Sequence, residues 1–322
     1  MSSRPTVAVV VCAYTEDRWE DVLAAYDSLV SQTAAPDQIV FVVDHNPSLL
    51  AGLRRAFPIA RVVPNTGPRG LSGARNTGIA DTVSDLVLFL DDDAWAEDDW
   101  VSHMVAPFAD PGVVAVAGWA EPDWVQPGRP RWFPESFLWV VGCSYEGLPY
   151  ERADIRNPLG CAMAFRRSAL ELVGGFSGAI GRVGTHPVGC EETELAIRVR
   201  QAQPSARVVL EPLAIVHHKV TAPRLRPRYF VYRCFWEGVS KAVVSKAVGA
   251  GDALESERSY ATRVLPRAFG RGVLDALRGK PTGLLRSAAV AAGLVATTVG
   301  YLRGGLSGST APRTATFQAE AE

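Results

Sequence analysis

Three consecutive carboxylates, Asp91, Asp92 and Asp93, follow the short apolar run of residues 87–90. The length and residue types of this run predict a buried strand. Like charges at a strand end do not favour folding, so we expect a cation to compensate them. Asp91 and Asp93 would point the same way, and carboxylate ligands suit Mg²⁺ or Mn²⁺. A solvated acidic turn would explain the triplet alone about equally well, whereas a hard cation would indicate phosphate chemistry.

Two further predicted strands also end in polar residues. Asp44 follows the apolar run 39–43, and His217 and His218 follow the run 208–216. A histidine pair after a buried strand is a better ligand candidate than a single histidine, although an ordinary polar strand end is the alternative. Loops after strand C-termini carry ligand-binding residues in α/β folds. We therefore expect these side chains near a bound ligand.

A glycine-rich loop and an acidic helix start supply the remaining candidates. Glycines in residues 65–78 permit close approach to the backbone, and Arg69 or Arg75 could neutralise a diphosphate. The loop matches neither the Walker pattern nor Gly-x-Gly-x-x-Gly, so alone it is equally compatible with a solvated loop. Glu191 and Glu192 open a predicted helix, where acidic residues commonly stabilise the helix dipole.

Alternating strands and helices must position these residues. Residues 6–14 predict a strand, and Thr15 is suited to cap the helix that follows. A strand at 39–43, a helix at 48–56 and a strand at 61–64 complete a βαβαβ unit. Later predictions are helices at 98–108, 168–173 and 189–201, strands at 113–119, 160–166 and 208–216, and a loop at 121–134. This order predicts an α/β fold, with a mostly parallel sheet and helices on both faces.

The composition indicates a folded body with a differently charged C-terminal part. The chain has 322 residues, of which 48% are hydrophobic and 21% charged, enough for one large domain or two smaller ones. Residues 1–220 contain 18 Lys and Arg against 27 Asp and Glu, whereas residues 221–322 contain 15 against 7. Five widely spaced cysteines indicate neither a disulfide framework nor a zinc site. Because no secretion signal is visible, we expect a cytoplasmic protein.

Residues 221–303 predict a basic helical extension that meets a membrane surface. Arginines and aromatic residues alternate from Arg224 onward, a pattern that could bind RNA or lipid headgroups. Residues 264–278 can form an amphipathic helix, and residues 287–302 contain no charge but fall short of the roughly 20 residues that span a bilayer. These segments favour an interfacial helix and no nucleic-acid partner, with a buried core helix as the alternative. Residues 304–322 are expected to be a disordered tail.

Five motifs in order make the sequence resemble the family 2 glycosyltransferases, which are inverting nucleotide-sugar enzymes of the GT-A fold. The motifs are Val-Cys-Ala-Tyr-Thr-Glu at 11–16, Val-Val-Asp at 42–44, Gly-Ala-Arg-Asn-Thr-Gly at 73–78, Leu-Asp-Asp-Asp at 90–93 and Gly-Cys-Glu-Glu-Thr-Glu-Leu at 189–195. The resemblance implies a GT-A catalytic domain at 1–220, with a nucleotide-sugar half at 1–93 and an acceptor half at 94–220. The Arg-rich stretch that follows resembles the extension of bacterial, membrane-associated members.

The family pattern implies a role for each candidate residue. The residues implied to bind the nucleotide are Ala13, Tyr14, Glu16, Asp44, Arg75, Asp91 and Asp92. Asp93 is implied as the metal ligand, and His218 would complete the metal or diphosphate site, with His217 as its neighbouring alternative. Glu192 aligns with the usual catalytic base, and Glu191 precedes it.

Two departures from the family pattern concern the residues that bind the nucleotide and the residue that acts as the catalytic base. The asparagine that often follows the first strand is absent, and His45 and Asn46 stand where Asp and Gly are common, so the nucleotide base stays open. The acceptor motif usually reads Glu-Asp, whereas this chain has Glu191 and Glu192. A carboxylate is therefore retained, one methylene longer.

The resemblance implies transfer of a sugar from a nucleotide-diphosphate sugar to a hydroxyl of a glycan or glycolipid of the cell envelope. A divalent cation, Mn²⁺ or Mg²⁺, and Asp93 would stabilise the leaving diphosphate. Glu192 would deprotonate the acceptor hydroxyl, and attack from that side would invert the anomeric centre. We expect a peripheral protein on the inner face of the cell membrane.

Three other functions compete with this interpretation. A polyprenyl-phosphate sugar synthase would share the fold and motifs and would suit the membrane-prone extension. A nucleotidyltransferase is disfavoured because residues 12–18 lack a glycine-rich loop with a basic residue. A non-catalytic module that binds only lipid or a partner is disfavoured, because it would not require all of the retained carboxylates.

Overall fold

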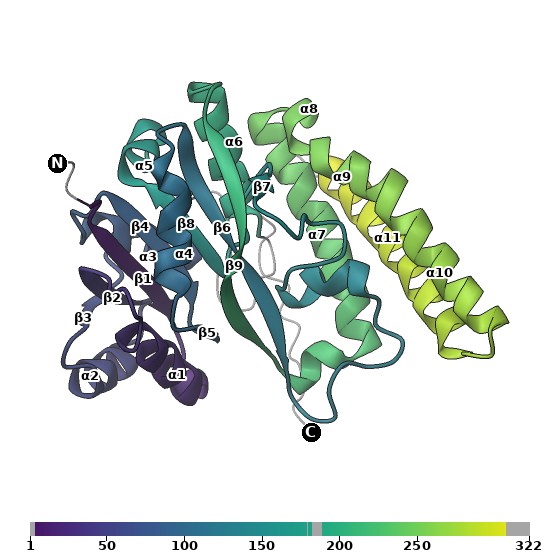
Figure 1. Cartoon of the computed structure of the whole chain (residues 1–322), viewed down its shortest axis with the longest axis horizontal. Coiled ribbons are helices and arrows are strands. Elements are labelled where there is room, and N and C mark those ends of the chain that lie inside the picture. Colours follow the sequence, from purple (N-terminus) through teal and green to yellow (C-terminus); the bar gives the residue numbers. More distant parts are fainter. Residues whose placement is uncertain (1–3, 179, 182–188, 307–322) are drawn as a thin grey trace.

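A sheet forms the centre of the computed structural model, which describes residues 4–178, 180–181 and 189–306 (Figure 1). Its strands follow the order β3-β2-β1-β4-β8-β6-β9-β5, and β7 pairs with β9. The bounds are β1 Val7–Ala13, β2 Gln38–Val43, β3 Arg61–Pro64, β4 Leu86–Asp91, β5 Ala94–Ala96, β6 Val113–Trp124, β7 Ala153–Asp154, β8 Ala162–Arg166 and β9 Arg207–Val220.

The helices form two groups, those that pack around the sheet and those of the C-terminal extension. Those of the first part are α1 Trp19–Val30, α2 Pro47–Ala56, α3 Leu71–Ala80, α4 Trp100–Val105, α5 Arg167–Val173 and α6 Glu191–Ala202. Those of the C-terminal extension are α7 Pro227–Val248, α8 Ala250–Ala253, α9 Glu255–Ser259, α10 Leu265–Leu277 and α11 Thr282–Leu306.

The first four strands in the order are parallel, which brings their C-terminal ends to one edge. β1 pairs in parallel with β2 and β4, and β2 pairs with β3. Parallel strands are buried on both faces, and β1 follows this rule because Val9 and Val11 belong to one core and Val10 to another. β8 then runs antiparallel to β4 and β6, and β6 is parallel to β9. The predicted α/β fold is confirmed.

Three predicted boundaries are wrong. β6 continues to Trp124, so the predicted loop at 121–134 begins later. β9 continues to Val220 because it still pairs with β5 and β6, so His217 and His218 lie within a strand and not after it. The uncharged run 287–302 is only the middle of α11, a helix of 25 residues that includes Gly304 and Leu306. The rest of the predicted tail, from residue 307, lies outside the described residues.

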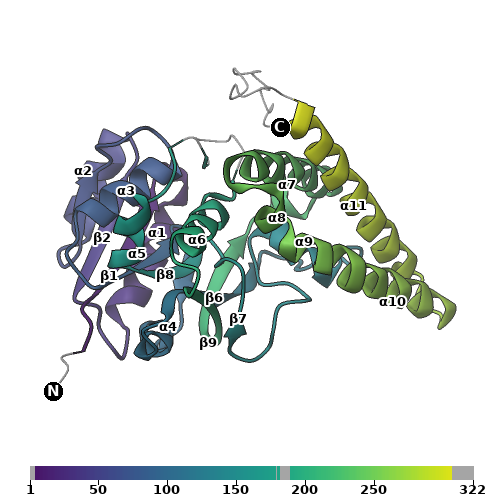
Figure 2. The ribbon, with the colours of Figure 1, turned by 90° about the horizontal axis from the view of Figure 1, so that it is seen from above.

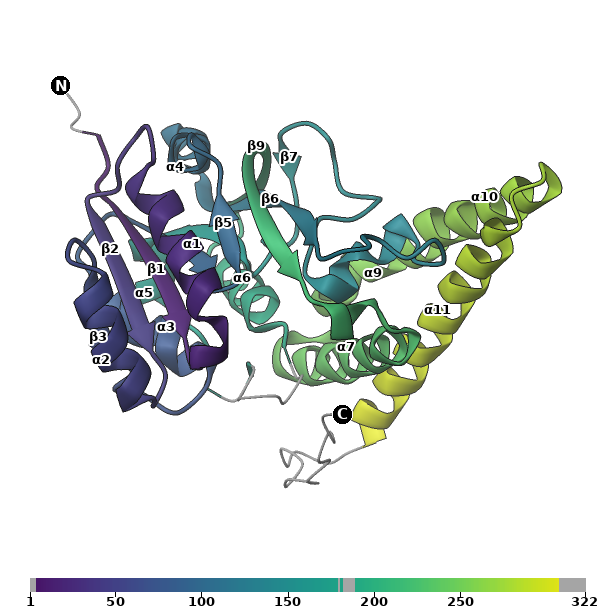
Figure 3. The ribbon, with the colours of Figure 1, turned by 90° about the horizontal axis from the view of Figure 1, so that it is seen from below.

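The C-terminal extension packs on the body through α7, while α10 and α11 project away from the sheet as a helical hairpin (Figures 2 and 3). A Cβ atom at Gly238 would lie 2.0 Å from the Thr297 carbonyl oxygen, and one at Gly300 would lie 1.9 Å from that of Phe235. These glycines therefore allow α7 and α11 to pack backbone against backbone. The buried side of α11 joins an aromatic core that includes Phe137 and Phe230.

Candidate active site

Asp44 fixes the glycine-rich loop at the end of β2. Its Oδ2 accepts a hydrogen bond from the backbone N–H of Gly70 at 2.9 Å, and its Oδ1 accepts one from the Asn65 side chain at 2.6 Å. His45 Nδ1 lies 2.8 Å from the same Oδ1. Because Asp44 is buried, these contacts replace its water shell. The carboxylate thereby sets the start of α3, the helix that carries Arg75.

The segment after β1 lies beside the end of β2, as predicted. The Asn46 side-chain amide donates to Glu16 Oε2 at 2.7 Å and to the Tyr14 carbonyl oxygen at 3.2 Å. Ala13 is buried at the end of β1, whereas the Tyr14 ring is partly exposed. The structure therefore places the four residues that were predicted at the nucleoside on two adjacent segments, joined by the Asp44 N–H donating to the Ala13 carbonyl oxygen at 2.8 Å and by the contacts of Asn46. Their contacts with a nucleotide stay a prediction.

The acidic triplet is already compensated in part by cations of the protein. Arg18 Nη1 lies 2.6 Å from Asp92 Oδ1 and 3.2 Å from Asp93 Oδ2. Arg224 Nη2 lies 3.1 Å from Asp93 Oδ2, and His218 Nε2 lies 3.2 Å from Asp93 Oδ1. The sequence argument expected a bound cation as the compensating charge. The structure adds Arg18 and Arg224, which that argument did not assign to the site.

The members of the triplet differ in their protonation behaviour. Burial raises the pKa of Asp92 to about 7, although Arg18 opposes this effect. Burial acts on Asp93 in the same direction, but His218 and the two arginines hold its pKa well below the usual range. Burial alone would lower the pKa of His218, whereas the Asp93 carboxylate raises it to about 10. Asp93 is therefore more firmly ionised than Asp92.

Asp91, Asp93 and His218 fit a divalent metal ion. One ligand atom from each lies within 4.8 Å of the others. Two carboxylates and one imidazole are donors that Mn²⁺ accepts, provided that His218 loses its proton when the ion binds. Such an ion could take its remaining ligands from diphosphate oxygens and water. Asp92 directs one oxygen to Arg18 and is not in this group.

His217 and His218 point to different surroundings, and only His218 faces the acidic triplet. His217 Nε2 lies 3.1 Å from Glu97 Oε1, and its ring stacks on Trp95 at 3.9 Å between centroids. His218 alone of the two contacts Asp93. Successive residues of a strand face opposite sides, so β9 can offer only one of them to the triplet.

Arg75 is a buried link between the two halves of the site. Its Nη1 donates to Glu191 Oε1 at 2.7 Å, and its Nη2 donates to Asp91 Oδ1 at 3.3 Å and to the Gly160 carbonyl oxygen at 2.8 Å. The side chain is 2% exposed. The sequence argument placed Arg75 at the nucleotide, and that contact stays a prediction. In the structure its hydrogen bonds hold Asp91 relative to α6.

Glu191 and Glu192 are separated in role by their surroundings. Glu191 is buried against Arg75. Glu192 is only partly buried and lines a cavity, and burial together with the charge of Glu191 raises its pKa to about 7. A carboxylate that titrates near neutrality can accept a proton from a substrate and release it again. Glu192 therefore has the environment of a general base, and Glu191 that of a positioning residue.

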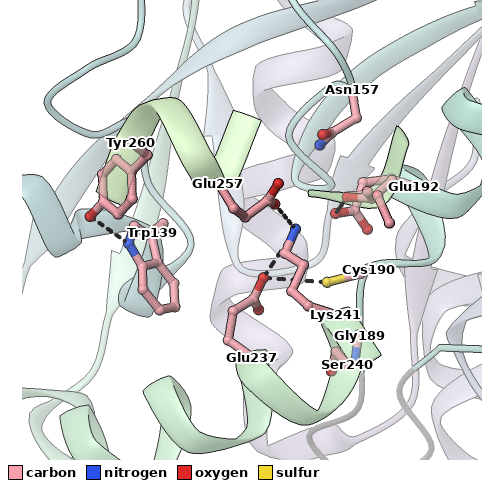
Figure 4. Close-up of polar contacts among 12 residues, drawn as sticks. Trp139, Asn157, Gly189, Cys190, Glu192, Glu237, Ser240, Lys241, Glu257 and Tyr260 are labelled. Carbon is pink, nitrogen blue, oxygen red and sulfur yellow. Dashed lines mark hydrogen bonds and ion pairs between the residues drawn. The ribbon is translucent and has the colours of Figure 1, made fainter. Parts of the chain in front are cut away.

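A cavity of about 410 Å³ joins these groups to the C-terminal extension. Its walls include Asp91, His218 and Glu192 from the body and residues of α7, α9 and α11 from the extension. The close-up in Figure 4 shows Glu192 beside a polar cluster that contains Lys241 and Glu257. Sequence reasoning missed this cluster because these residues lie far from every motif along the chain.

Comparisons with known proteins agree with this geometry. The model of the family described as glycosyl transferase family 2 matches residues 8–174. A glucosyl-dolichyl phosphate glucuronosyltransferase of Haloferax volcanii is 36% identical over 242 residues, which cover 74% of this chain and 77% of that protein. The succinoglycan biosynthesis protein ExoM of Rhizobium meliloti is 26% identical over 239 residues, 72% of each chain.

Solved structures share the fold. A mannosyltransferase from Pyrobaculum calidifontis, in complex with GDP-Man and Mn²⁺, has a TM-score of 0.57 and 21% identity and covers 92% of this chain and 88% of its own. GalNAc-T7 with UDP, GalNAc and Mn²⁺ has a TM-score of 0.51 and 15% identity, covering 80% of this chain and 54% of its own. The predicted GT-A fold is confirmed, and the chain belongs to glycosyl transferase family 2.

Proposed function

We propose that this glycosyltransferase moves a sugar, with inversion, from a nucleotide-diphosphate sugar to a hydroxyl group of a lipid-linked sugar. The observation that carries the proposal is the placement of Glu192. Its carboxylate, with a pKa raised to about 7, lines the same cavity as Asp91 and His218. A base and a candidate metal-diphosphate site thus border one space in which two substrates could meet.

The donor would bind along the ends of β1, β2 and β4. Asp44, Tyr14 and Glu16 would hold the nucleoside, and Asp91, Asp93 and His218 would hold Mn²⁺ or Mg²⁺. Such an ion, when bound, stabilises the negative charge that develops on the diphosphate. Two solved structures with this fold were determined with Mn²⁺ and a nucleotide or nucleotide sugar, which supports this arrangement.

The surroundings of Glu192 favour a hydroxyl acceptor over a phosphate acceptor. A hydroxyl group must lose a proton to attack, so it requires a base. A phosphate oxygen is already anionic at neutral pH, requires no base, and would meet the charges of Glu191 and Glu192. We therefore prefer an acceptor that already carries a sugar to the bare lipid phosphate of a polyprenyl-phosphate sugar synthase. The name of the Haloferax volcanii relative, which includes glucosyl-dolichyl phosphate, is consistent with this choice.

The helical hairpin would bind the inner face of the cell membrane and place the site near its acceptor. α11 is long and apolar enough to cross a membrane by length and composition, and 33% of its most apolar stretch is buried inside the structure. The exposed apolar residues of α10 and α11 are Phe269, Leu274, Leu277, Leu284, Leu285, Leu294, Val295, Val299, Leu302 and Leu306. The exposed Arg267, Arg278 and Lys280 lie on or beside α10. Such a combination suits an anionic lipid surface.

The role of Glu192 predicts a specific pH dependence. Below a pH of about 7, Glu192 would hold a proton and could not accept another, so kcat should rise as the pH increases through 7. Glu192→Gln should lower kcat by about 10²- to 10⁴-fold and remove this rise. Nucleoside diphosphate release, screened with nucleotide sugars, Mn²⁺ and a lipid extract, measures both effects. Glu171→Gln, an exposed change on α5, is the control; full activity of Glu192→Gln would exclude Glu192 as the base.

The proposed role of Asp93 as a metal ligand predicts that transfer depends on this carboxylate and on a bound divalent ion. Asp93→Asn should nearly abolish transfer and weaken Mn²⁺ binding, measured by the loss of the free-ion EPR signal on titration, while circular dichroism shows an intact fold. Asp98→Asn changes an exposed carboxylate nearby and should leave both properties unchanged. Equal Mn²⁺ binding by Asp93→Asn and the unchanged protein would remove Asp93 as a ligand.

The apolar hairpin predicts vesicle binding. The double variant Leu277→Ser and Leu285→Ser should reduce co-sedimentation with anionic phosphatidylglycerol vesicles at low salt, because both side chains are exposed on the hairpin. Leu213→Ser removes an equally apolar, exposed side chain from β9 and should bind as the unchanged protein does. If the full chain stays in the supernatant, or if the double variant binds undiminished, the membrane proposal fails.

A further inference from the structure

The cavity beside Glu192 continues into the C-terminal extension and changes in character along its length. Next to Glu192 its lining is polar, with Asn157, Lys241 and Glu257. Farther along, it is lined by Leu294, Thr297, Thr298 and Tyr301 of α11. One continuous space therefore joins the candidate base to the helix whose outer face is apolar.

The polar part is a cluster of charged residues from separate segments (Figure 4). Lys241 Nζ lies 2.7 Å from Glu257 Oε1 and 3.4 Å from Glu237 Oε1. Arg156 Nη2 donates to Glu257 Oε1 at 2.8 Å. The Cys190 thiol, immediately before the acidic helix start, donates to Glu237 at 3.3 Å. The cluster thus connects α7 and α9 to the helix that carries Glu192.

The charges of this cluster indicate the class of ligand that it suits. Three cations, Lys241, Arg156 and Arg233, pair with two carboxylates, Glu237 and Glu257, so the cations outnumber the carboxylates by one. A phosphate or carboxylate group placed directly against Glu257 would nevertheless meet its negative charge and that of Glu192. A neutral polyhydroxyl ligand can donate to the carboxylates and accept from the ammonium group, which matches the donors and acceptors present. The charged residues of the cluster keep their ordinary ionised forms. Lys241 and Arg156, for example, hold the pKa of Glu257 at about 2, although burial opposes this shift.

Aromatic side chains border the same part of the cavity. The Trp139 indole N–H donates to the Tyr260 hydroxyl at 3.1 Å, and Tyr145 contacts Tyr260 edge to face at 5.6 Å between centroids. All three residues line the cavity. Rings of this kind offer apolar faces to the C–H groups of a sugar while their polar atoms keep partners.

At Leu294 the cavity borders the exposed apolar surface of α11. Leu294 lines the cavity and is 41% exposed, and its neighbours Val295 and Val299 on α11 are 62% and 50% exposed. An apolar chain that leaves the cavity past Leu294 would therefore continue along the outer face of α11 and not into water.

We propose that Lys241, Glu257 and Asn157 bind the sugar ring of the acceptor, and that its lipid chain leaves the cavity past Leu294. This inference rests on the proposed function and identifies the acceptor as a glycolipid whose sugar hydroxyl faces Glu192. Specificity for the acceptor sugar would then depend in part on the C-terminal extension, because Lys241 and Glu257 lie outside the residues that the family model matches, whereas Asn157 lies within them.

The test compares two acceptors that differ only in chain length: glucosyl phosphate linked to dolichol and glucosyl phosphate linked to a short isoprenoid alcohol, both in detergent. Lys241→Met should raise the acceptor KM about tenfold or more for both, because a charged hydrogen bond is lost, and leave the donor KM unchanged. Leu294→Asn should raise the KM only for the dolichol acceptor. Thermal unfolding reports whether each variant is folded.

Matched controls separate binding from packing. Lys246→Met removes a second lysine of α7 that does not line the cavity, and Leu213→Asn removes an exposed apolar side chain of β9 that does not line it either; both should leave the acceptor KM unchanged. Asn157→Ala leaves the charged cluster in place, so it tests the sugar site even if Lys241→Met does not fold. If transfer is intact and the acceptor KM is unchanged in Asn157→Ala and Lys241→Met, this inference is overturned while the proposed function stands. No transfer to either acceptor from any nucleotide sugar would overturn the proposed function and the inference with it.

Discussion

The buried guanidinium of Arg75 is the contact on which the arrangement of the site depends. Arg75 joins Asp91, at the end of β4, to Glu191, at the start of α6. Loss of one partner from a buried charge pair typically costs about 3–5 kcal/mol, so the buried Glu191 cannot move away from Arg75 cheaply. The link therefore fixes the distance between the candidate metal ligands and the candidate base. It also explains why Glu191 and Glu192, identical in type, have different surroundings.

The sequence predicted the parts of the fold and site that depend on local patterns. Apolar runs that end in Asp44 or Asp91 located the parallel strands, and the parallel pairing then brought both ends to one edge. Arg18 and Arg224 were not assigned to the site, because their contacts with Asp93 connect segments far apart in the chain and leave no periodic pattern. The position of His218 inside β9 was likewise hidden, since only pairing with β5 and β6 extends that strand beyond its apolar run.

The C-terminal extension lines the cavity of the candidate site and also presents an apolar surface. α7 is held to α11 where Gly238 and Gly300 allow their backbones to touch. The same α7 carries Lys241 into the cavity beside Glu192. If the hairpin moved on a lipid surface, the close contact between α11 and α7 would therefore transmit that movement to Lys241 in the proposed acceptor site. This coupling gives a physical reason for the α/β body and the apolar hairpin to form one molecule.

The central claim is that Glu192 activates an acceptor hydroxyl for direct attack on the anomeric carbon, on the side opposite the diphosphate. The most direct measurement is the anomeric configuration of the first product, read from the proton coupling constant of its new glycosidic bond by NMR. An α-configured nucleotide sugar should give a β-linked product. A product that retains the α configuration would contradict the account, because it would require an intermediate that a single attack does not form.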